Sequence, residues 1–210
     1  MSTPVCTPMS TPVSTPMSTP AFNPILLDIP DRLRTARLLL RAPRPGDGAV
    51  VHDSVVETLA ALRRHPSSLP WAQAEPSVAA SEEYVRRGAA HWLLRSELPM
   101  LAFRGPDDDE HVGNLGLHRF NWETRVFEIG WWCRQRFQGQ GYMTEAAGAL
   151  TEFAFSRLGA RRVWCLADEG NPPSWRVAER LGYRHEGTLM GERCDPDGTR
   201  RHMRVYAATR

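Results

Sequence analysis

Apolar residues recur at helical spacing in two segments of the first half of the chain. Valines and leucines three or four residues apart predict a helix over 47–64. A second helix is expected to begin after Ser77 or Ser81, either of which can cap it, and to end near Arg95. We expect the apolar side of this second helix to carry Tyr84, Trp92 and Leu93.

Elsewhere the apolar period shortens to two, which is typical of strands. Short runs of this kind, bounded by Gly, Pro, Asp and Asn, predict seven strands. The expected strands cover 37–41, 100–104, 111–120, 125–133, 162–167, 183–189 and 202–208. The three strands between 100 and 133 are separated only by turn residues, so they should form an antiparallel meander.

The second half of the chain adds two helices to this pattern. The clearest amphipathic segment is 141–158, which Gly159 closes, and a shorter helix is expected over 171–181. The order of elements is therefore β-α-α-β-β-β-α-β-α-β-β, which predicts a mixed α/β sheet flanked by helices. The 210 residues fit one domain, which we place at 25–210.

The first 24 residues repeat a Ser-Thr-Pro-x tetrapeptide, with a proline at every fourth position. Such a tract has almost nothing to bury, and each proline removes a backbone donor. We therefore expect a disordered tail over 1–24. It is either a docking or phosphorylation segment or a dispensable leader.

Composition and charge narrow the classes of function. All 26 basic residues are arginines, and 24 acidic residues nearly balance them to give a net charge of +2, so nucleic-acid binding is not predicted. The four cysteines show neither a C-x-x-C pair nor zinc-site spacing, which indicates reduced thiols and no metal site. No apolar run approaches the ~20 residues of a membrane helix, and no secretory signal opens the chain. We therefore expect a cytoplasmic protein without a membrane partner.

One segment carries candidate chemistry, at the start of the clearest helix. It reads Gln138-Gly139-Gln140-Gly141-Tyr142-Met143-Thr144. The first turn of a helix presents unpaired N–H groups and a partial positive charge, and glycines let a diphosphate approach the backbone. A P-loop would need a lysine, which the chain lacks, and a dinucleotide-binding G-x-G-x-x-G motif is not present here. A phosphate-bearing cofactor of another class is expected, although a tight strand-to-helix turn is the structural alternative.

These residues are similar to a known family. The loop resembles the signature Gln/Arg-x-x-Gly-x-Gly/Ala of the GNAT acetyltransferases, and the preceding Glu128-Ile129-Gly130-Trp131-Trp132 resembles the splayed fourth strand of that family. Met143 departs from the pattern, which usually has Gly or Ala there. Further motifs resemble the RimJ/RimL-type branch, which contains ribosomal-protein N-terminal acetyltransferases. They are Thr144-Glu145-Ala146, Phe153-Ala154-Phe155, Arg161-Arg162-Val163, Asn171-Pro172-Pro173-Ser174 and Leu181-Gly182-Tyr183-Arg184-His185-Glu186-Gly187.

The resemblance covers about residues 35 to 208 and implies a GNAT fold that binds acetyl-CoA. By this resemblance, the backbone N–H groups of 138–144 hold the pyrophosphate, and main-chain groups of Trp131 and Cys133 pair with the pantetheine arm. It also implies that Asn171 contacts the cofactor and that Ser174 protonates the departing thiolate. Asn171 followed by proline equally fits a simple helix N-cap, with Ser174 in the first turn.

A base is useful because an attacking amine must be neutral, and an α-amino group has a pKa of ~7.7–8.0. The resemblance points to Glu192, although Arg193 competes for the aligned position. Glu128 and His118 are alternatives, and either can instead have a structural role in the sheet. Trp71 and Trp122 are candidates for aromatic walls of the acceptor cleft, beside His118.

Three functions remain open at this point. The first is acetylation of the N-terminal α-amine of a protein or peptide, and the second is acetylation of a small amine such as an antibiotic, amino acid or polyamine. The third is an acyl-CoA-binding module without catalysis. The acceptor is set by the variable segments 45–98 and 186–202, and a homodimer is an open alternative because many relatives pair.

Overall fold

The computed structural model describes residues 22–105, 107 and 109–210. The expected tail over 1–24 therefore lies outside the described residues, apart from its last three positions. Those three are structured, because Asn23 caps the 3-10 turn η1 (Pro24–Leu26) by accepting a hydrogen bond from the Ile25 N–H at 3.1 Å.

The chain builds one eight-stranded sheet with the order β1-β2-β3-β4-β5-β6-β8-β7. Neighbouring strands are antiparallel except β5 and β6, which are parallel. The strands are β1 (Arg32–Arg34), β2 (Leu39–Arg41), β3 (Leu98–Arg104), β4 (Glu110–Asn121), β5 (Val126–Cys133), β6 (Arg162–Asp168), β7 (Arg184–Cys194) and β8 (Arg200–Thr209). The predicted mixed sheet and the meander of β3, β4 and β5 are confirmed.

Two strands differ from the prediction. Strand β1 was not expected, because Arg32-Leu33-Arg34 is short and mostly charged, yet it pairs with β2 at Leu33↔Leu40. Strand β7 runs to Cys194 rather than 189. All its residues are exposed or only partly buried, so no alternation of apolar and polar residues marks where the strand ends. Long pairing with β8 sets the length of this strand.

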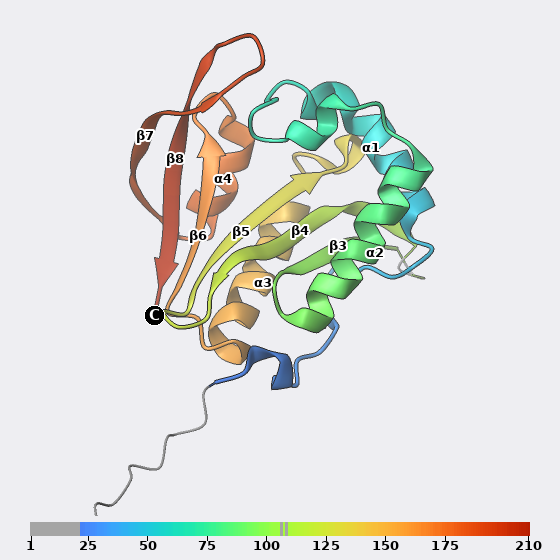
Figure 1. Ribbon diagram of the computed structural model, residues 1–210, viewed down its shortest axis with the longest axis vertical. Coiled ribbons are helices and arrows are strands. Elements are labelled where there is room, and N and C mark those ends of the chain that lie inside the picture. Colours follow the sequence, from blue (N-terminus) through green and yellow to red (C-terminus); the bar gives the residue numbers. More distant parts are fainter. Residues whose placement is uncertain (1–21, 106, 108) are drawn as a thin grey trace, which may run out of the picture.

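Four helices cover the sheet, as predicted: α1 (Gly48–Leu62), α2 (Val78–Leu94), α3 (Tyr142–Arg157) and α4 (Pro172–Arg180). Helices α1 and α2 lie on one face of the sheet, whereas α3 packs on β4 and β5 from the other face (Figure 1). Helix α4 packs on β6 and β8 beside α3. No helix in the described part of the chain is long and apolar enough to cross a membrane.

The buried side of α2 is not the one that was expected. Ser77 does cap the helix, accepting from the Ala80 N–H at 3.1 Å, but Leu93 is 71% exposed and Tyr84 41% exposed. The buried stripe consists of Val85, Gly88 and Trp92. Consecutive residues point about 100° apart around a helix, so Trp92 and Leu93 cannot both face the sheet.

Each face of the sheet has its own hydrophobic cluster. The larger cluster packs α3 and α4 against the sheet and includes Phe127 and Ile129 of β5. The smaller cluster packs α1 against β3 and includes Val55 and Leu101. Because side chains alternate along a strand, Glu128, Gly130 and Trp132 of β5 face α1 and α2, where a cavity lies.

Candidate active site

The sheet splits between its two parallel strands. Strands β5 and β6 pair only over Val126–Glu128 with Arg162–Trp164. Beyond this point β5 stays paired with β4 as far as Cys133, and β6 stays paired with β8 as far as Asp168, so the two strands diverge as a fork (Figure 1). The facing edges have no ladder partner across the gap, and an extended ligand with amide groups can pair with such edges as an added strand.

A short loop leads from the open end of β5 to helix α3. It contains the 3-10 turn η3 (Gln135–Phe137) and two glycines in the left-handed region, Gly139 at φ +73° and Gly141 at φ +80°. Gly141 occupies the N-cap position of α3, and no side chain caps the helix. The first N–H groups of α3 therefore remain available at the exposed loop, together with the positive end of the helix dipole.

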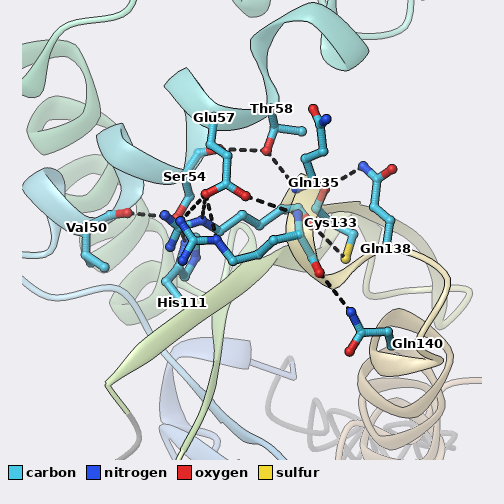
Figure 2. A network of polar contacts seen from close by, with 11 residues as sticks. Val50, Ser54, Glu57, Thr58, His111, Cys133, Gln135, Gln138 and Gln140 are labelled. Carbon is cyan, nitrogen blue, oxygen red and sulfur yellow. Dashed lines mark hydrogen bonds and ion pairs between the residues drawn. The ribbon is translucent and has the colours of Figure 1, made fainter.

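The side chains of the predicted loop mostly serve the loop itself. The Nε2 of Gln138 donates to the Cys133 carbonyl at 3.0 Å, and the Nε2 of Gln140 donates to the Arg136 carbonyl at 2.8 Å (Figure 2). Tyr142 and Met143 are buried in the larger cluster. Met143 therefore packs in the core, and the groups that the loop can offer an anion are its backbone amides.

Glu57 of α1 anchors the first part of the loop, which sequence reasoning missed. Its carboxylate accepts from the Arg134 Nε at 2.7 Å and from the Arg136 backbone N–H at 3.0 Å. Figure 2 shows Glu57 pointing from α1 to the loop, beside Thr58, which accepts from the Gln135 N–H at 3.0 Å. The hydrogen bonds from Arg136, with those from Arg134, lower the pKa of Glu57 from 4.5 to about 2.

A second anchor, also missed, holds the loop from the side of α3. Arg37 donates from Nε to Glu145 Oε2 at 2.6 Å and from Nη1 to the Gln140 carbonyl at 3.1 Å. Its guanidinium also lies 4.4 Å from the centre of the Tyr142 ring. The two anchors join residues that are 79 and 108 positions apart in the sequence, and the only local signal was an acidic residue in the first turn of α3.

A cavity of about 820 Å³ lies on the α1 and α2 face and extends into the fork. A second cavity, of about 600 Å³, adjoins it and shares His118, Arg119 and Glu128 with it. Of the residues expected from the sequence, the first cavity brings together Trp71, His118, Glu128, Trp131, Asn171 and Ser174. The Trp131 Nε1 is buried and has no hydrogen-bond partner among the described residues.

The start of α4 closes the opposite side of the fork. Asn171 takes the N-cap position and Pro172 the first position of the helix, but the Asn171 side chain makes no capping hydrogen bond. Both Asn171 and Ser174 line the cavity. Their side chains are therefore available to a ligand. If Asn171 were only a helix cap, its side chain would instead bond the first turn of α4.

Of the residues expected for catalysis or for the acceptor cleft, Trp122 and Glu192 do not line the cavity. Trp122 donates from Nε1 to the Arg95 carbonyl at 3.1 Å and packs on Phe127, which is the α3 face of the sheet. Glu192 is exposed on β7 and its neighbour Arg193 lines the cavity instead, because adjacent residues of a strand point to opposite sides.

The parts of the site fit a long cofactor with a diphosphate at one end and amides along its arm. The uncapped turn of α3 offers N–H groups, the open space over Gly139 admits a phosphate, and the unpaired strand edges offer backbone partners. Cys133 lies at the end of β5, between the fork and the loop. The loop itself does not line the cavity, which extends along β5 from Glu128 to Trp132, so Cys133 lies between the cavity and the loop.

Comparison with known proteins gives a consistent result. The model of the acetyltransferase (GNAT) domain matches residues 37–184, more than two thirds of the chain. An uncharacterized N-acetyltransferase, YnaD, of Bacillus subtilis is 33% identical over 92 residues, 44% of this chain and 52% of that protein. The ribosomal-protein-serine acetyltransferase of Escherichia coli is 33% identical over 123 residues, 58% of this chain and 66% of that protein.

A solved structure shares the fold. The ribosomal L7/L12 alpha-N-protein acetyltransferase RimL in complex with coenzyme A superposes with a TM-score of 0.75 at 24% identity, over 83% of this chain and 95% of that chain. The sequence matches to the first curated relatives span about half of the length of those proteins.

Proposed function

The chain belongs to the GNAT acetyltransferase family, and from this premise we propose that it transfers the acetyl group of acetyl-CoA to a primary amine. The observation that carries the proposal is the fork, which joins a cavity at one end to an uncapped helix N-terminus at the other. Bound acetyl-CoA would supply an acetyl group activated as a thioester. The residues of the chain bind the cofactor, align the two reactants and transfer the protons.

Each part of the site has a role in this proposal. The backbone N–H groups of Gly139 to Thr144 bind the diphosphate, whereas the Gln138 N–H donates to the Gln135 carbonyl and the Gln138 and Gln140 side chains hold loop carbonyls. Main-chain groups of Trp131 and Cys133 pair with the pantetheine arm, and Asn171 contacts the cofactor from α4. Ser174, at the cavity wall, donates a proton to the departing sulfur.

We propose the N-terminal α-amine of a protein or peptide as the acceptor. The match to the ribosomal-protein-serine acetyltransferase supports this class. The second cavity beside the first also offers room for residues that follow the reacting amine. A cytoplasmic location remains part of the proposal, since three of the cysteines, Cys133, Cys165 and Cys194, are free thiols.

The acceptor class is tested by release of thiol from acetyl-CoA against a panel of amines. Peptides with a free α-amine should react, the same peptides blocked at that amine should not, and spermidine and amino acids should react more slowly. Faster turnover of a small amine would instead support the small-molecule alternative. Coenzyme A binding without turnover of any amine would indicate a binding module without catalysis.

Ser174→Ala is expected to lower kcat by about 10- to 100-fold, within the lower range of general acid–base effects. The dissociation constant of coenzyme A should change less than twofold, because the pyrophosphate loop is untouched. Ser156→Ala is the matched control, since Ser156 lies on α3 and donates to the Glu152 carbonyl. Equal kcat values for the two variants would remove Ser174 from the mechanism.

Glu57→Gln should raise the dissociation constant of coenzyme A by about three- to tenfold, which is ~0.7–1.4 kcal/mol. The variant loses the charge-assisted hydrogen bonds that hold Arg134 and Arg136, so the loop is less well ordered before it binds. Calorimetric titration measures the change. Glu152→Gln breaks a pair with Arg210 on the far side of α3 and should leave the affinity unchanged.

The same glutamate predicts a pH dependence of stability. The folded state lowers the pKa of Glu57 from 4.5 to about 2, so the stabilisation is complete above pH 4.5 and is lost as the pH falls toward 2. Its size is at most about 3 kcal/mol, because 1 pKa unit is ~1.36 kcal/mol and the side chain is partly exposed. The difference in unfolding free energy between the wild type and Glu57→Gln should therefore shrink below pH 4.5, and a constant difference would contradict this account.

A further inference from the structure

A buried carboxylate lies at the point where the fork opens. Glu128 is 5% exposed and belongs to the last register pair between β5 and β6, Glu128↔Trp164. Its two oxygens contact two residues of β4: Oε1 lies 3.1 Å from the Nε2 of His118, and Oε2 lies 3.1 Å from the Nη1 of Arg119. The carboxylate is thus compensated on both sides at the border of the two cavities.

An irregularity in β4 makes this arrangement possible. His118 and Arg119 are consecutive, and consecutive residues of a regular strand point to opposite faces. Arg119 has φ +48°, and the register with β5 shifts between His118 and Asn121. His118 faces Glu128 as its regular register partner, and the bulge turns Arg119 toward Glu128 as well, at a cost of roughly 1–2 kcal/mol for a residue that is not glycine. Strain of this kind is concentrated at functional sites.

The missing side chain of Gly130 makes room for the imidazole. A Cβ at Gly130 would lie 2.9 Å from the Cε1 of His118, so the ring covers this part of β5. Gly130 is the second residue after the last paired position of the fork, and both residues line the cavity. The imidazole is therefore held beside the gap that the thioester would enter.

We propose that His118 accepts the proton of the attacking amine, and that Glu128 is the positioning residue that orients it; this inference rests on the proposed acetyl transfer. The Glu128 carboxylate lies 3.1 Å from Nε2 of His118 and favours the tautomer with its proton on Nε2, which leaves the lone pair on Nδ1 for a proton. Arg119 donates from Nη1 to the second carboxylate oxygen at 3.1 Å. The carboxylate then stabilises the imidazolium.

The transfer balances with the groups in place. The amine nitrogen forms its bond to the acetyl carbon as the carbon–sulfur bond breaks, and the amine proton moves to Nδ1 of His118. The departing sulfur takes a proton from Ser174, which regains one from solvent, and His118 releases its proton to solvent.

Other charged groups line the same cavity and affect the pH dependence of the reaction. From strands β4, β6 and β7 these are Arg119, Asp168 and Arg193. From α2 and the adjoining loops they are His65, Glu75, Arg87, His91 and Glu97. His65 has its own carboxylate neighbour, Asp168 Oδ2 at 3.6 Å at the far end of β6, whereas His118 contacts the carboxylate at the last paired position between β5 and β6.

The test compares His118→Gln with His52→Gln in the pH dependence of kcat/KM for a peptide acceptor. His52 also lies beside a carboxylate, Asp53 at 3.5 Å, but it does not line either cavity. His118→Gln should lower kcat/KM by about 100-fold or more. On the acidic side the slope of log kcat/KM against pH should fall from about 2 to about 1, because only the amine still has to lose a proton.

Two further variants separate the roles within the pair. Glu128→Gln should lower kcat and leave the dissociation constant of coenzyme A within twofold, and Gly130→Ala should lower kcat by displacing the ring. An unchanged rate and slope in His118→Gln would overturn the proposal, as would activity lost in Glu128→Gln but kept in His118→Gln. Failure of the wild type to acetylate any amine would instead refute the proposed function, so the two failures are distinguishable.

Discussion

Gly141→Val is expected to raise the dissociation constant of coenzyme A by about 100-fold, equivalent to ~2.8 kcal/mol at 1.4 kcal/mol per tenfold. Gly141 has φ +80° at the N-cap of α3, a conformation that costs other residues roughly 1–2 kcal/mol and costs β-branched residues more. The variant either turns the first amides of the helix away or places methyl groups where a diphosphate must approach. Both outcomes weaken binding, which calorimetry measures directly.

Gly159→Val is the matched control for this substitution. Gly159 has φ +64°, and a Cβ there would meet nothing within 4 Å. It follows the opposite end of α3, so the variant carries a similar backbone strain without touching the loop. Its melting temperature should fall as that of Gly141→Val does, with the affinity for coenzyme A unchanged. Equal affinities in the two variants would show that the loop amides do not bind the diphosphate.

Arg201→Ala is expected to lower the free energy of unfolding by about 3–5 kcal/mol, the range for a buried ion pair that loses one partner. The Nε of Arg201 lies 3.1 Å from Asp168 Oδ2 and 3.0 Å from Asp195 Oδ2, whose side chains are 3% and 8% exposed. The Nε–H is not aligned with either oxygen, so the contact acts through charge rather than as a hydrogen bond. Without Arg201, two buried carboxylates would face each other.

Denaturant unfolding of a second variant tests this explanation. Asp195→Asn removes one of the two carboxylates, so the double variant Arg201→Ala/Asp195→Asn should be more stable than Arg201→Ala alone. Arg200→Ala is the control, because Arg200 is the exposed neighbour on β8. A deficit of Arg201→Ala below ~1 kcal/mol, or a double variant no more stable than Arg201→Ala, would mean that Arg201 contributes little through these charges.

The periodic part of the fold was predictable from the sequence because it depends on local spacing. The four helices and the meander follow from apolar periods of 3.6 and 2. The fork was expected only through family resemblance, since strand divergence has no local pattern. Strand β1 escaped prediction because pairing with β2, rather than an apolar run, makes it a strand.

The candidate site was predictable where it lies on one continuous segment and not where distant segments meet. The loop from Gln138 to Thr144 could be found because its glycines precede a helix. Glu57 and Arg37 could not, because their partners are set by how α1 and β2 dock on the loop. Trp122 was misplaced for a related reason: the bulge at Arg119 changes which face the following residues take.

Three register pairs are all that join the two halves of the sheet at the fork. The strands β1 to β5 pair with one another, as do β6 to β8, whereas the two halves are joined only by these three pairs. A ligand bound along the gap would connect the two halves. Amide protons on both sides should then exchange more slowly together, although the ligand touches each half only along one edge.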